Sequence, residues 1–278
     1  MTPRELIRTT AARFRDAGIP DPENDAALLL SRLTARPPLD LRLDTDTVLD
    51  SAVLSDFETL SSKRLTRTPL QYLLEEAPFY HRVFRVDSRV LIPRPETELL
   101  CEWALEMIPE AESSRVLDLC CGSGCIGLTV KAERPGAQVT LSDISAGALE
   151  VASLNAAALS LDVSLRQADL LDGFPVSSFD MILSNPPYIP AGECDSLQAE
   201  VLYEPRLALD GGPDGCDIYR RIAESARSVL SPGGKLLMEL GIGQAGPVAD
   251  LLAAGGYTGI QTRKDYAGID RMILAVRP

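Results

Sequence analysis

Residues 180–188 read Asp-Met-Ile-Leu-Ser-Asn-Pro-Pro-Tyr, an apolar run that stops abruptly at two prolines. The apolar half has the length and composition typical of a buried strand. Pro186 and Pro187 have no N–H to donate to a neighbouring strand, so the strand must end before them. The residue before a proline is held in an extended backbone. The sequence therefore predicts that Asn185 is fixed at the carboxyl end of a buried strand, where open α/β sheets bind ligands.

The four residues from Asn185 to Tyr188 offer a distinctive set of binding groups. Asn185 has a carbonyl acceptor and an NH₂ donor, the carbonyl of Pro186 is free of strand pairing, and Tyr188 has a flat ring for stacking. Two converging acceptors and a ring suit a planar NH₂ group, such as an amide or the exocyclic amine of a base. Accepting both N–H bonds would favour a pyramidal nitrogen and aim its lone pair at an electrophile. The alternative is a proline-rich loop that merely ends a strand.

Strand and helix patterns alternate from residue 115 to the end of the chain. This alternation is typical of an α/β fold built on a mostly parallel, doubly wound sheet. The predicted strands are Arg115–Leu119, Val139–Ser142, Val163–Arg166, Met181–Ser184, Lys235–Leu240, Tyr257–Thr262 and Arg271–Val276. The predicted helices are Cys125–Glu133, Ala146–Leu159, Asp217–Leu230 and one that follows Gly243.

The first third of the chain has apolar residues at helical spacing. Helices are predicted from Pro3 to Gly18, over 25–33 and over 48–65, which together make a small helical domain. A strand-forming run over 79–86 predicts a hairpin linker, and Pro95 can begin the next helix. We expect domains at 1–75 and 93–278, joined by a linker at 76–92. The helical domain is interpreted as a substrate-docking module, with a packing appendage as the alternative.

A glycine-rich turn follows the first predicted strand of the sheet. Residues 118–127 read Asp-Leu-Cys-Cys-Gly-Ser-Gly-Cys-Ile-Gly, and such a strand-to-helix turn lets a ligand approach the backbone closely. The pattern also matches the Gly-x-Gly-x-x-Gly fingerprint of nicotinamide dinucleotide sites. Asp143, after the second strand, is placed to bind ribose hydroxyls. A nicotinamide dinucleotide and other nucleoside cofactors both need such an acid, so Asp143 does not distinguish between them. Asp118 suits a cofactor with a positively charged amino-acid part, and Asp169 with Leu170 would suit an adenine.

Composition limits the classes of function. The net charge of −13 argues against a broad grip on nucleic-acid phosphates. The six cysteines show no paired zinc spacing and His81 is the only histidine, so no metal site is expected. No signal sequence and no apolar run of membrane-spanning length are visible, which leads us to expect a cytoplasmic protein with free thiols.

Several of these segments resemble a known family. The blocks at 118–125, Asp143 and 184–188 are similar to class I S-adenosylmethionine-dependent methyltransferases that act on planar nitrogen. More narrowly, the blocks at 91–98 (Leu-Ile-Pro-Arg-Pro-Glu-Thr-Glu), 204–212 and 263–271 resemble the peptide chain release factor glutamine N5-methyltransferases. The similarity covers nearly the whole chain, and the blocks stand in the family's order.

The resemblance implies a fold, a reaction and a set of site residues. The fold would be a Rossmann-like sheet of seven strands, with the last strand antiparallel, preceded by a helical domain and a hairpin. S-adenosylmethionine would donate a methyl group to the glutamine amide of the Gly-Gly-Gln motif of release factors, a step linked to translation termination. The implied catalytic residues are Asn185, Pro186 and Tyr188, and the substrate site would add Pro187. The implied cofactor residues are Asp118, Cys120, Cys121, Gly122, Ser123, Gly124, Asp143, Asp169, Leu170 and Asn185.

The sequence departs from the family pattern at four positions. The family usually has glycine at the position of Cys120 and commonly at those of Glu75 and His81. An aromatic ring is often found at the position of Leu170. A residue other than glycine at position 120 must either adopt an ordinary backbone conformation or carry strain.

Other functions stay open at this point. Methylation of amino groups in DNA shares the Asn-Pro-Pro-Tyr motif, but it would need base flipping and a basic recognition domain. A ribosomal-protein glutamine is a second possible target. A non-catalytic cofactor-binding or docking module is a third reading, and Cys120 is the one feature that favours it. An NAD-dependent dehydrogenase is the least favoured, because no proton-relay residue accompanies the glycine turn.

Overall fold

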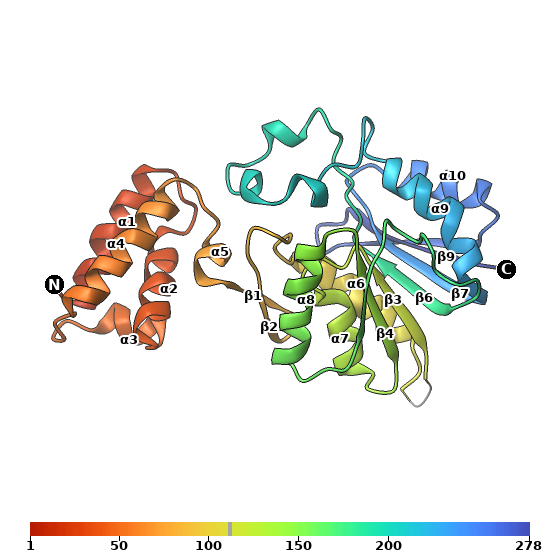
Figure 1. Cartoon of the computed structure of the whole chain (residues 1–278). Coiled ribbons are helices and arrows are strands. Elements are labelled where there is room, and N and C mark those ends of the chain that lie inside the picture. Colours follow the sequence, from red (N-terminus) through yellow and green to blue (C-terminus); the bar gives the residue numbers. More distant parts are fainter. Residues whose placement is uncertain (111–112) are drawn as a thin grey trace. The chain divides into compact units, whose positions relative to one another are not determined.

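A computed structural model describes residues 1–110 and 113–278 (Figure 1). The chain divides into two compact units. The first contains residues 1–76 together with 198–203, and the second contains residues 77–197 and 204–278. No helix among the described residues is both long and apolar enough to cross a membrane.

The first unit is helical, as the spacing of its apolar residues predicts. Its helices are α1 (Pro3–Asp16), α2 (Pro22–Thr34), α3 (Pro38–Leu43), α4 (Ser51–Leu65) and α5 (Leu70–Leu74). The sequence analysis did not identify the short helices α3 and α5. A capping box between Thr2 and Glu5 begins α1, because each side chain accepts from the other residue's backbone N–H. The core of the unit is built around Phe14, Leu30 and Phe57, which are fully buried.

A short segment from later in the chain belongs to this helical unit. Buried Arg64 donates to Asp25 at 2.7 Å and also to Glu200, which lies in the segment 198–203. Arg67 donates to the other oxygen of Glu200 at 2.7 Å. Two arginines therefore hold one carboxylate, an association that the sequence pattern did not indicate.

Strands β1 (Glu76–Phe79) and β2 (Arg82–Arg85) form the predicted hairpin. Only Tyr80 and His81 connect them, and both have positive φ, 45° and 62°. Two-residue hairpin loops of the type I′ class need positive φ at both central positions. His81 and Glu75 (φ 59°) are two of the positions where the resembled family commonly has glycine, and this backbone geometry explains that preference.

The second unit contains a seven-stranded sheet in the order β5-β4-β3-β6-β7-β9-β8. Its strands are β3 (Arg115–Leu119), β4 (Gln138–Asp143), β5 (Ser164–Gln167), β6 (Phe179–Ser184), β7 (Leu230–Glu239), β8 (Thr258–Lys264) and β9 (Asp270–Val276). The pairs from β5 to β7 are parallel, and β9 runs antiparallel to both of its neighbours. The predicted Rossmann-like α/β fold with an antiparallel last strand is confirmed.

Helices cover both faces of this sheet (Figure 1). One face packs against α6 (Pro95–Met107), α7 (Cys125–Glu133) and α8 (Ala146–Ala158). The other packs against α9 (Asp217–Val229) and α10 (Ala245–Ala254). Successive strand residues alternate between the two cores: Met181 and Leu183 join the first and Ile182 joins the second. Three 3₁₀ helices, Cys194–Ser196, Val201–Tyr203 and Arg206–Ala208, occupy the long connection from β6 to α9.

Candidate active site

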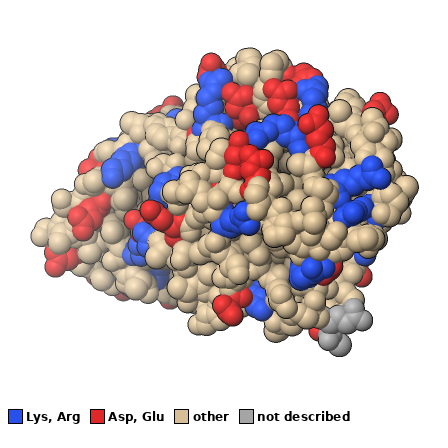
Figure 2. Space-filling view, turned by 45° about the vertical axis from the view of Figure 1, so that its right-hand side comes forward, with Lys and Arg blue, Asp and Glu red and all other residues tan. Residues whose placement is uncertain are grey.

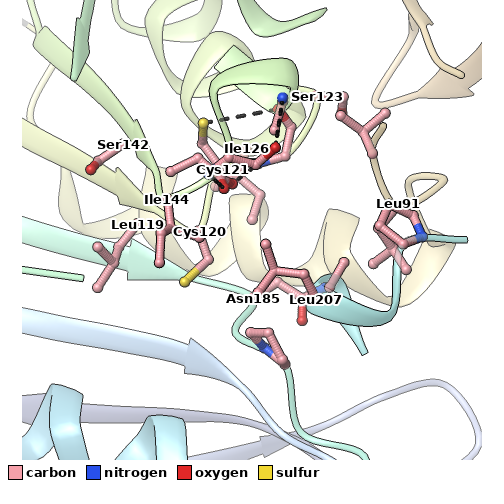
Figure 3. A pocket seen from close by; sticks show the side chains of 18 of the residues that line it. Leu91, Leu119, Cys120, Cys121, Ser123, Ile126, Ser142, Ile144, Asn185 and Leu207 are labelled. Carbon is pink, nitrogen blue, oxygen red and sulfur yellow. Dashed lines mark hydrogen bonds between the residues drawn. The ribbon is translucent and has the colours of Figure 1, made fainter. Parts of the chain in front are cut away.

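A cavity of about 180 Å³ lies in the second unit, where β3, β4 and β6 end. Its wall includes the turn after β3, the end of β4, the residues after β5 and the end of β6. In Figure 3, Leu91, Asn185 and Leu207 lie across the cavity from the turn that carries Cys121 and Ser123. The predicted strand ends therefore come together at one cavity.

Glycines shape the turn between β3 and α7. Gly122 and Gly124 have φ of 53° and 78°, which L side chains rarely adopt. A Cβ at Gly122 would meet no atom within 4 Å, so its backbone faces open space. A Cβ at Gly127 would stand 2.3 Å from the Leu141 side chain on β4. The third glycine of the fingerprint is therefore required for close packing of α7 on the sheet.

Cys120 stands where the resembled family usually has glycine, and it adopts the left-handed backbone conformation that glycine adopts most easily. Its φ is 59°, and this conformation costs a non-glycine residue roughly 1–2 kcal/mol. Burial raises the pKa values of the Cys120 and Cys121 thiols well above the ordinary value. Both side chains line the cavity as neutral thiols, since the thiolate form is disfavoured.

Asp143, the last residue of β4, lines the cavity and organises the backbone around it. One carboxylate oxygen accepts the Gly122 N–H at 2.9 Å, and the other accepts the Ser145 N–H at 2.9 Å. Burial raises the pKa of Asp143, while these backbone N–H groups oppose the rise. Each carboxylate oxygen can accept a further bond, so Asp143 can still receive ribose hydroxyls.

Asp118 has a different position from the one predicted for a cofactor ligand. Its side chain is fully buried, and it is absent from the described residues that line the cavity. Oδ2 accepts the Gly127 N–H at 2.8 Å, which anchors the first turn of α7, and Oδ1 has no partner among the described residues. Burial raises the pKa of Asp118 to about 7. The Asp118 side chain therefore lies beneath the turn rather than in the cavity wall.

Asp169 and Leu170, which follow β5, both line the cavity as predicted. The Asp169 carboxylate is held by Arg221 of α9 at 2.8 Å. Leu170 is nearly buried and has a φ of 49°. Together they present an acceptor and an apolar surface on the same side of the cavity wall.

Asn185 and Pro187 line the cavity at the end of β6. The Ser184 hydroxyl donates to the Leu119 carbonyl of β3 at 2.7 Å, which fixes this strand end. The Asn185 side-chain NH₂ lies 3.3 Å from the Thr97 hydroxyl oxygen. Pro186 is buried and is absent from the described lining residues.

Tyr188 points to a second cavity rather than to the first. It lines a space of about 880 Å³ that is also bounded by Gly241, Gln244 and Arg271. Its hydroxyl donates to Glu239 at 3.3 Å, and burial raises its pKa to about 12. Tyr188 is absent from the described residues that line the first cavity, and its stacking on a group bound beside Asn185 stays a prediction. The backbone carbonyl of Tyr188 accepts from Gln244 at 2.9 Å, which ties this loop to the turn before α10.

Sequence reasoning missed several residues that shape the site. Thr97 and Glu239 lie behind Asn185, and Leu207 completes the wall of the first cavity. Thr97 and Leu207 fall within the blocks 91–98 and 204–212, which carried the family resemblance without an assigned role. That resemblance was the one signal in the sequence that could have identified Thr97 and Leu207 as site residues. Glu239 had none, because it is simply the last residue of a buried strand.

The described part of the chain contains no group of three or more His, Cys, Asp or Glu residues that could hold a metal ion.

Two family models match this chain. The model described as methyltransferase small domain matches residues 97–212, and the model described as PrmC N-terminal domain matches residues 5–74.

Similar proteins cover nearly the full length. A release factor glutamine methyltransferase of Cereibacter sphaeroides is 42% identical, over 100% of this chain and 99% of that protein. One of Chlorobaculum tepidum is 42% identical, over 96% of this chain and 94% of that protein. One of Caulobacter vibrioides is 39% identical, over 95% of this chain and 93% of that protein.

Two solved structures share the fold of about 70% of this chain. A methyltransferase from Pyrococcus furiosus aligns with a TM-score of 0.54 at 18% identity, over 70% of this chain and 88% of that one. A 16S rRNA methyltransferase of T. thermophilus, in complex with AdoMet and guanosine, aligns with a TM-score of 0.54 at 20% identity, over 73% and 50%. At these identities the likeness shows the fold alone. The identity and coverage of the curated relatives decide the family: the chain belongs to the release factor glutamine methyltransferases.

Proposed function

We propose that this chain transfers the methyl group of S-adenosylmethionine to the side-chain amide nitrogen, N5, of the glutamine in the Gly-Gly-Gln motif of peptide chain release factors. One observation carries the proposal. A single cavity is lined by the glycine turn with Asp143 and also by Asn185 with Pro187. Asn185, which is proposed to bind a planar NH₂ group, therefore adjoins the elements that suit a nucleoside cofactor. The release factor glutamine methyltransferases at 39–42% identity support the same reaction.

The residues around the cavity fit S-adenosylmethionine. Gly122 offers open backbone beside Asp143, whose carboxylate can accept the ribose hydroxyls. Asp169 and Leu170 would hold the adenine, while Cys120, Cys121 and Ser123 would surround the methionine part. Gly124, also predicted as a cofactor residue, is absent from the described lining residues and shapes the turn instead. When bound, this cofactor supplies an electrophilic methyl group on a sulfonium sulfur.

The arginines of the cavity disfavour a dinucleotide. Arg89 is paired with Asp87 and Glu150, Arg94 with Glu204, and Arg221 with Asp169. Each arginine of the described wall is thus neutralised by a carboxylate, and none of the three is left for a pyrophosphate. This arrangement supports a cofactor of low negative charge.

The chain's contribution to the reaction is orientation. The Asn185 side-chain oxygen, in the cavity wall, would accept one N–H bond of the glutamine amide. The carbonyl of Pro186, which follows Asn185 but is absent from the described lining residues, is proposed as the second acceptor on the sequence motif alone. Those bonds direct the nitrogen lone pair towards the methyl group and preorganise the site for transfer. Transfer of the methyl group to the nitrogen lone pair would first give an N-methylated amide cation. This cation is strongly acidic and would lose one N–H proton to water to give the neutral N-methylamide, so no general base is required. Pro187, which lines the same cavity as Asn185, would limit the space available to the glutamine side chain.

The helical domain, residues 1–75, is proposed to dock the protein substrate, with residues 76–92 as linker and 93–278 as the methyltransferase domain. The match of residues 5–74 to a family-specific domain model supports a role that general methyltransferases do not share. Release factors act in the cytoplasm, which is therefore the proposed location.

Nucleic acid is disfavoured as a substrate. The net charge is −13, and acidic residues are interspersed with basic ones over the face shown in Figure 2. A DNA amino-group methyltransferase would need a continuous basic surface to hold phosphates. A ribosomal-protein glutamine is the second candidate, since its amide offers the same chemistry to Asn185.

A transfer assay with radiolabelled S-adenosylmethionine tests the proposal. The acceptors are a release factor, its Gly-Gly-Gln→Gly-Gly-Ala variant, a ribosomal protein fraction and plasmid DNA. We expect label on the wild-type release factor alone. Label on ribosomal protein or DNA would show that the release factor is not the substrate, while leaving the nitrogen chemistry in place. Binding of the cofactor without transfer of label to any acceptor would indicate a non-catalytic docking module.

Asn185→Ala tests the role of the amide. We expect this variant to lose turnover by at least about 100-fold, as for other preorganised transition-state groups, while its thermal unfolding changes little. Gln261→Ala, which removes an exposed amide on β8 of the second unit, is the control and should keep full turnover. Near-normal turnover of Asn185→Ala would refute the mechanism.

A further inference from the structure

Thr97 lies directly behind the Asn185 amide. It is in the first turn of α6, and its side chain is almost wholly buried at the cavity wall. Its hydroxyl oxygen is 2.6 Å from a carboxylate oxygen of Glu239 and 3.3 Å from the Asn185 side-chain nitrogen. A short series of contacts thus leads from a buried carboxylate at the end of β7 to the amide at the end of β6.

The number of protons fixes the direction of these hydrogen bonds. A threonine hydroxyl carries one proton, and a carboxylate can only accept, so Thr97 must donate to Glu239. The hydroxyl oxygen then has only lone pairs left to offer. Asn185 therefore donates from its NH₂ group to the Thr97 hydroxyl oxygen. The side-chain carbonyl oxygen of Asn185 is then free to accept from another partner.

Each carboxylate oxygen of Glu239 faces a hydroxyl group. It is fully buried at the end of β7, and burial raises its pKa. The Thr97 hydroxyl opposes that rise, as does Arg271, whose guanidinium lies 3.8 Å from Oε1. The Tyr188 hydroxyl donates to the same Oε1 at 3.3 Å. Both carboxylate oxygens therefore receive donors, as an ionised group requires.

We infer that Thr97 and Glu239 are positioning residues that determine which end of the Asn185 amide faces the acceptor. The inference rests on the proposed function, because it concerns recognition of a substrate NH₂ by Asn185. The two ends of an Asn amide have the same shape, and only hydrogen bonding distinguishes them. Turned the other way, Asn185 would present its NH₂ to the NH₂ of the substrate, and no hydrogen bond would form.

Thr97→Val and Thr97→Ser test the inference. Valine keeps the shape of threonine without the hydroxyl, whereas serine keeps the hydroxyl. We expect Thr97→Val to lower kcat at least about tenfold, with the KM for the release factor and the Kd for S-adenosylmethionine nearly unchanged, because neither depends on the amide orientation. Thr97→Ser should keep most of the wild-type kcat.

A double-mutant cycle separates positioning from packing. Glu239→Gln can offer an NH₂ to Thr97 and so lets the hydrogen bonds reverse. We expect it to lower kcat, and we expect Thr97→Val/Glu239→Gln to lose no more than the poorer single variant, because both act through the same amide. If Thr97 only joined α6 to the sheet, Thr97→Val would shift the unfolding midpoint but leave kcat unchanged in the folded enzyme.

The outcomes distinguish this inference from the proposed function. Wild-type kcat in a folded Thr97→Val variant overturns the inference and leaves the function intact. Should Thr97→Val fail to fold, Glu239→Gln and Thr97→Ala are measured in its place, and a wild-type kcat in either overturns it equally. Absence of transfer to the release factor by the wild-type protein refutes the function itself.

Discussion

Arg94 donates to Glu204 across 2.6 Å, and the Glu204 side chain is only 1% exposed. The two residues adjoin two different parts of the cavity wall: Arg94 follows Leu91 and Pro93, and Glu204 precedes Pro205 and Leu207. Burial raises the pKa of Glu204, and the Arg94 charge opposes the rise. The ion pair thus holds together two wall segments that lie 110 residues apart in the sequence.

Removal of Arg94 alone should destabilise the second unit. Arg94→Ala leaves a buried carboxylate without its counter-charge, and since Arg94 is about a third exposed we expect a loss of about 2 kcal/mol. Arg94→Ala/Glu204→Gln should recover much of this, because no buried charge remains. Urea unfolding measures both. Arg13→Ala, which breaks an exposed pair with Glu58, is the control and should cost less than about 1 kcal/mol. Equal losses for Arg94→Ala and the double variant would contradict the argument.

Asp143 and Asp118 should differ in their effect on cofactor binding. Asp143 lines the cavity, whereas Asp118 is buried beneath the turn. We expect Asp143→Asn to weaken S-adenosylmethionine binding by about 10- to 100-fold, the equivalent of 1.4–2.8 kcal/mol for lost charge-assisted hydrogen bonds. Asp118→Asn should change the Kd less than about threefold. Calorimetric titration of both variants with S-adenosylmethionine measures the two Kd values. A larger increase in Kd for Asp118→Asn than for Asp143→Asn would show that Asp118 contacts the cofactor.

Asp118 should also make stability depend on pH. Its pKa is raised from 3.8 to about 7, so between these values the folded chain holds a proton that the unfolded chain has lost. The unfolding free energy should therefore fall as pH rises from about 4 towards 7, by on the order of a few kcal/mol. Asp118→Asn removes this titration. Urea unfolding at pH 5, 6, 7 and 8 should show the variant gaining on the wild type as pH rises; parallel curves would contradict the assignment.

The hairpin loop should accept glycine. Tyr80 and His81 both have positive φ, and His81→Gly relieves a left-handed conformation at the cost of greater freedom in the unfolded chain. We expect a net gain of up to about 1 kcal/mol. Ala12→Gly, at an exposed position in the interior of α1, is the control and should lose about 1 kcal/mol. A similar loss in both variants would show that the loop carries no backbone strain.

The sequence by itself determined the fold class and the position of the strand ends. Apolar periodicity and the prolines after Asn185 are local signals, and they placed the β6 terminus and the glycine turn correctly. The departures from the family pattern at Cys120 and His81 drew attention to these positions, but only the structure gave their left-handed backbone conformation. Local patterns succeed here because backbone conformation is set by neighbouring residues.

The tertiary structure decided which side chains reach the cavity and what they contact. The Asp118 side chain lies beneath the first turn of α7, and Tyr188 lines a second cavity. Thr97 contacts Glu239, which is 142 residues away in the sequence. Whether a side chain at a strand end points into the cavity or beneath it depends on the packing of the next helix. The direction of a hydrogen bond depends on the partner's own bonds. Such contacts join residues distant in sequence, so no local pattern in the chain specifies them.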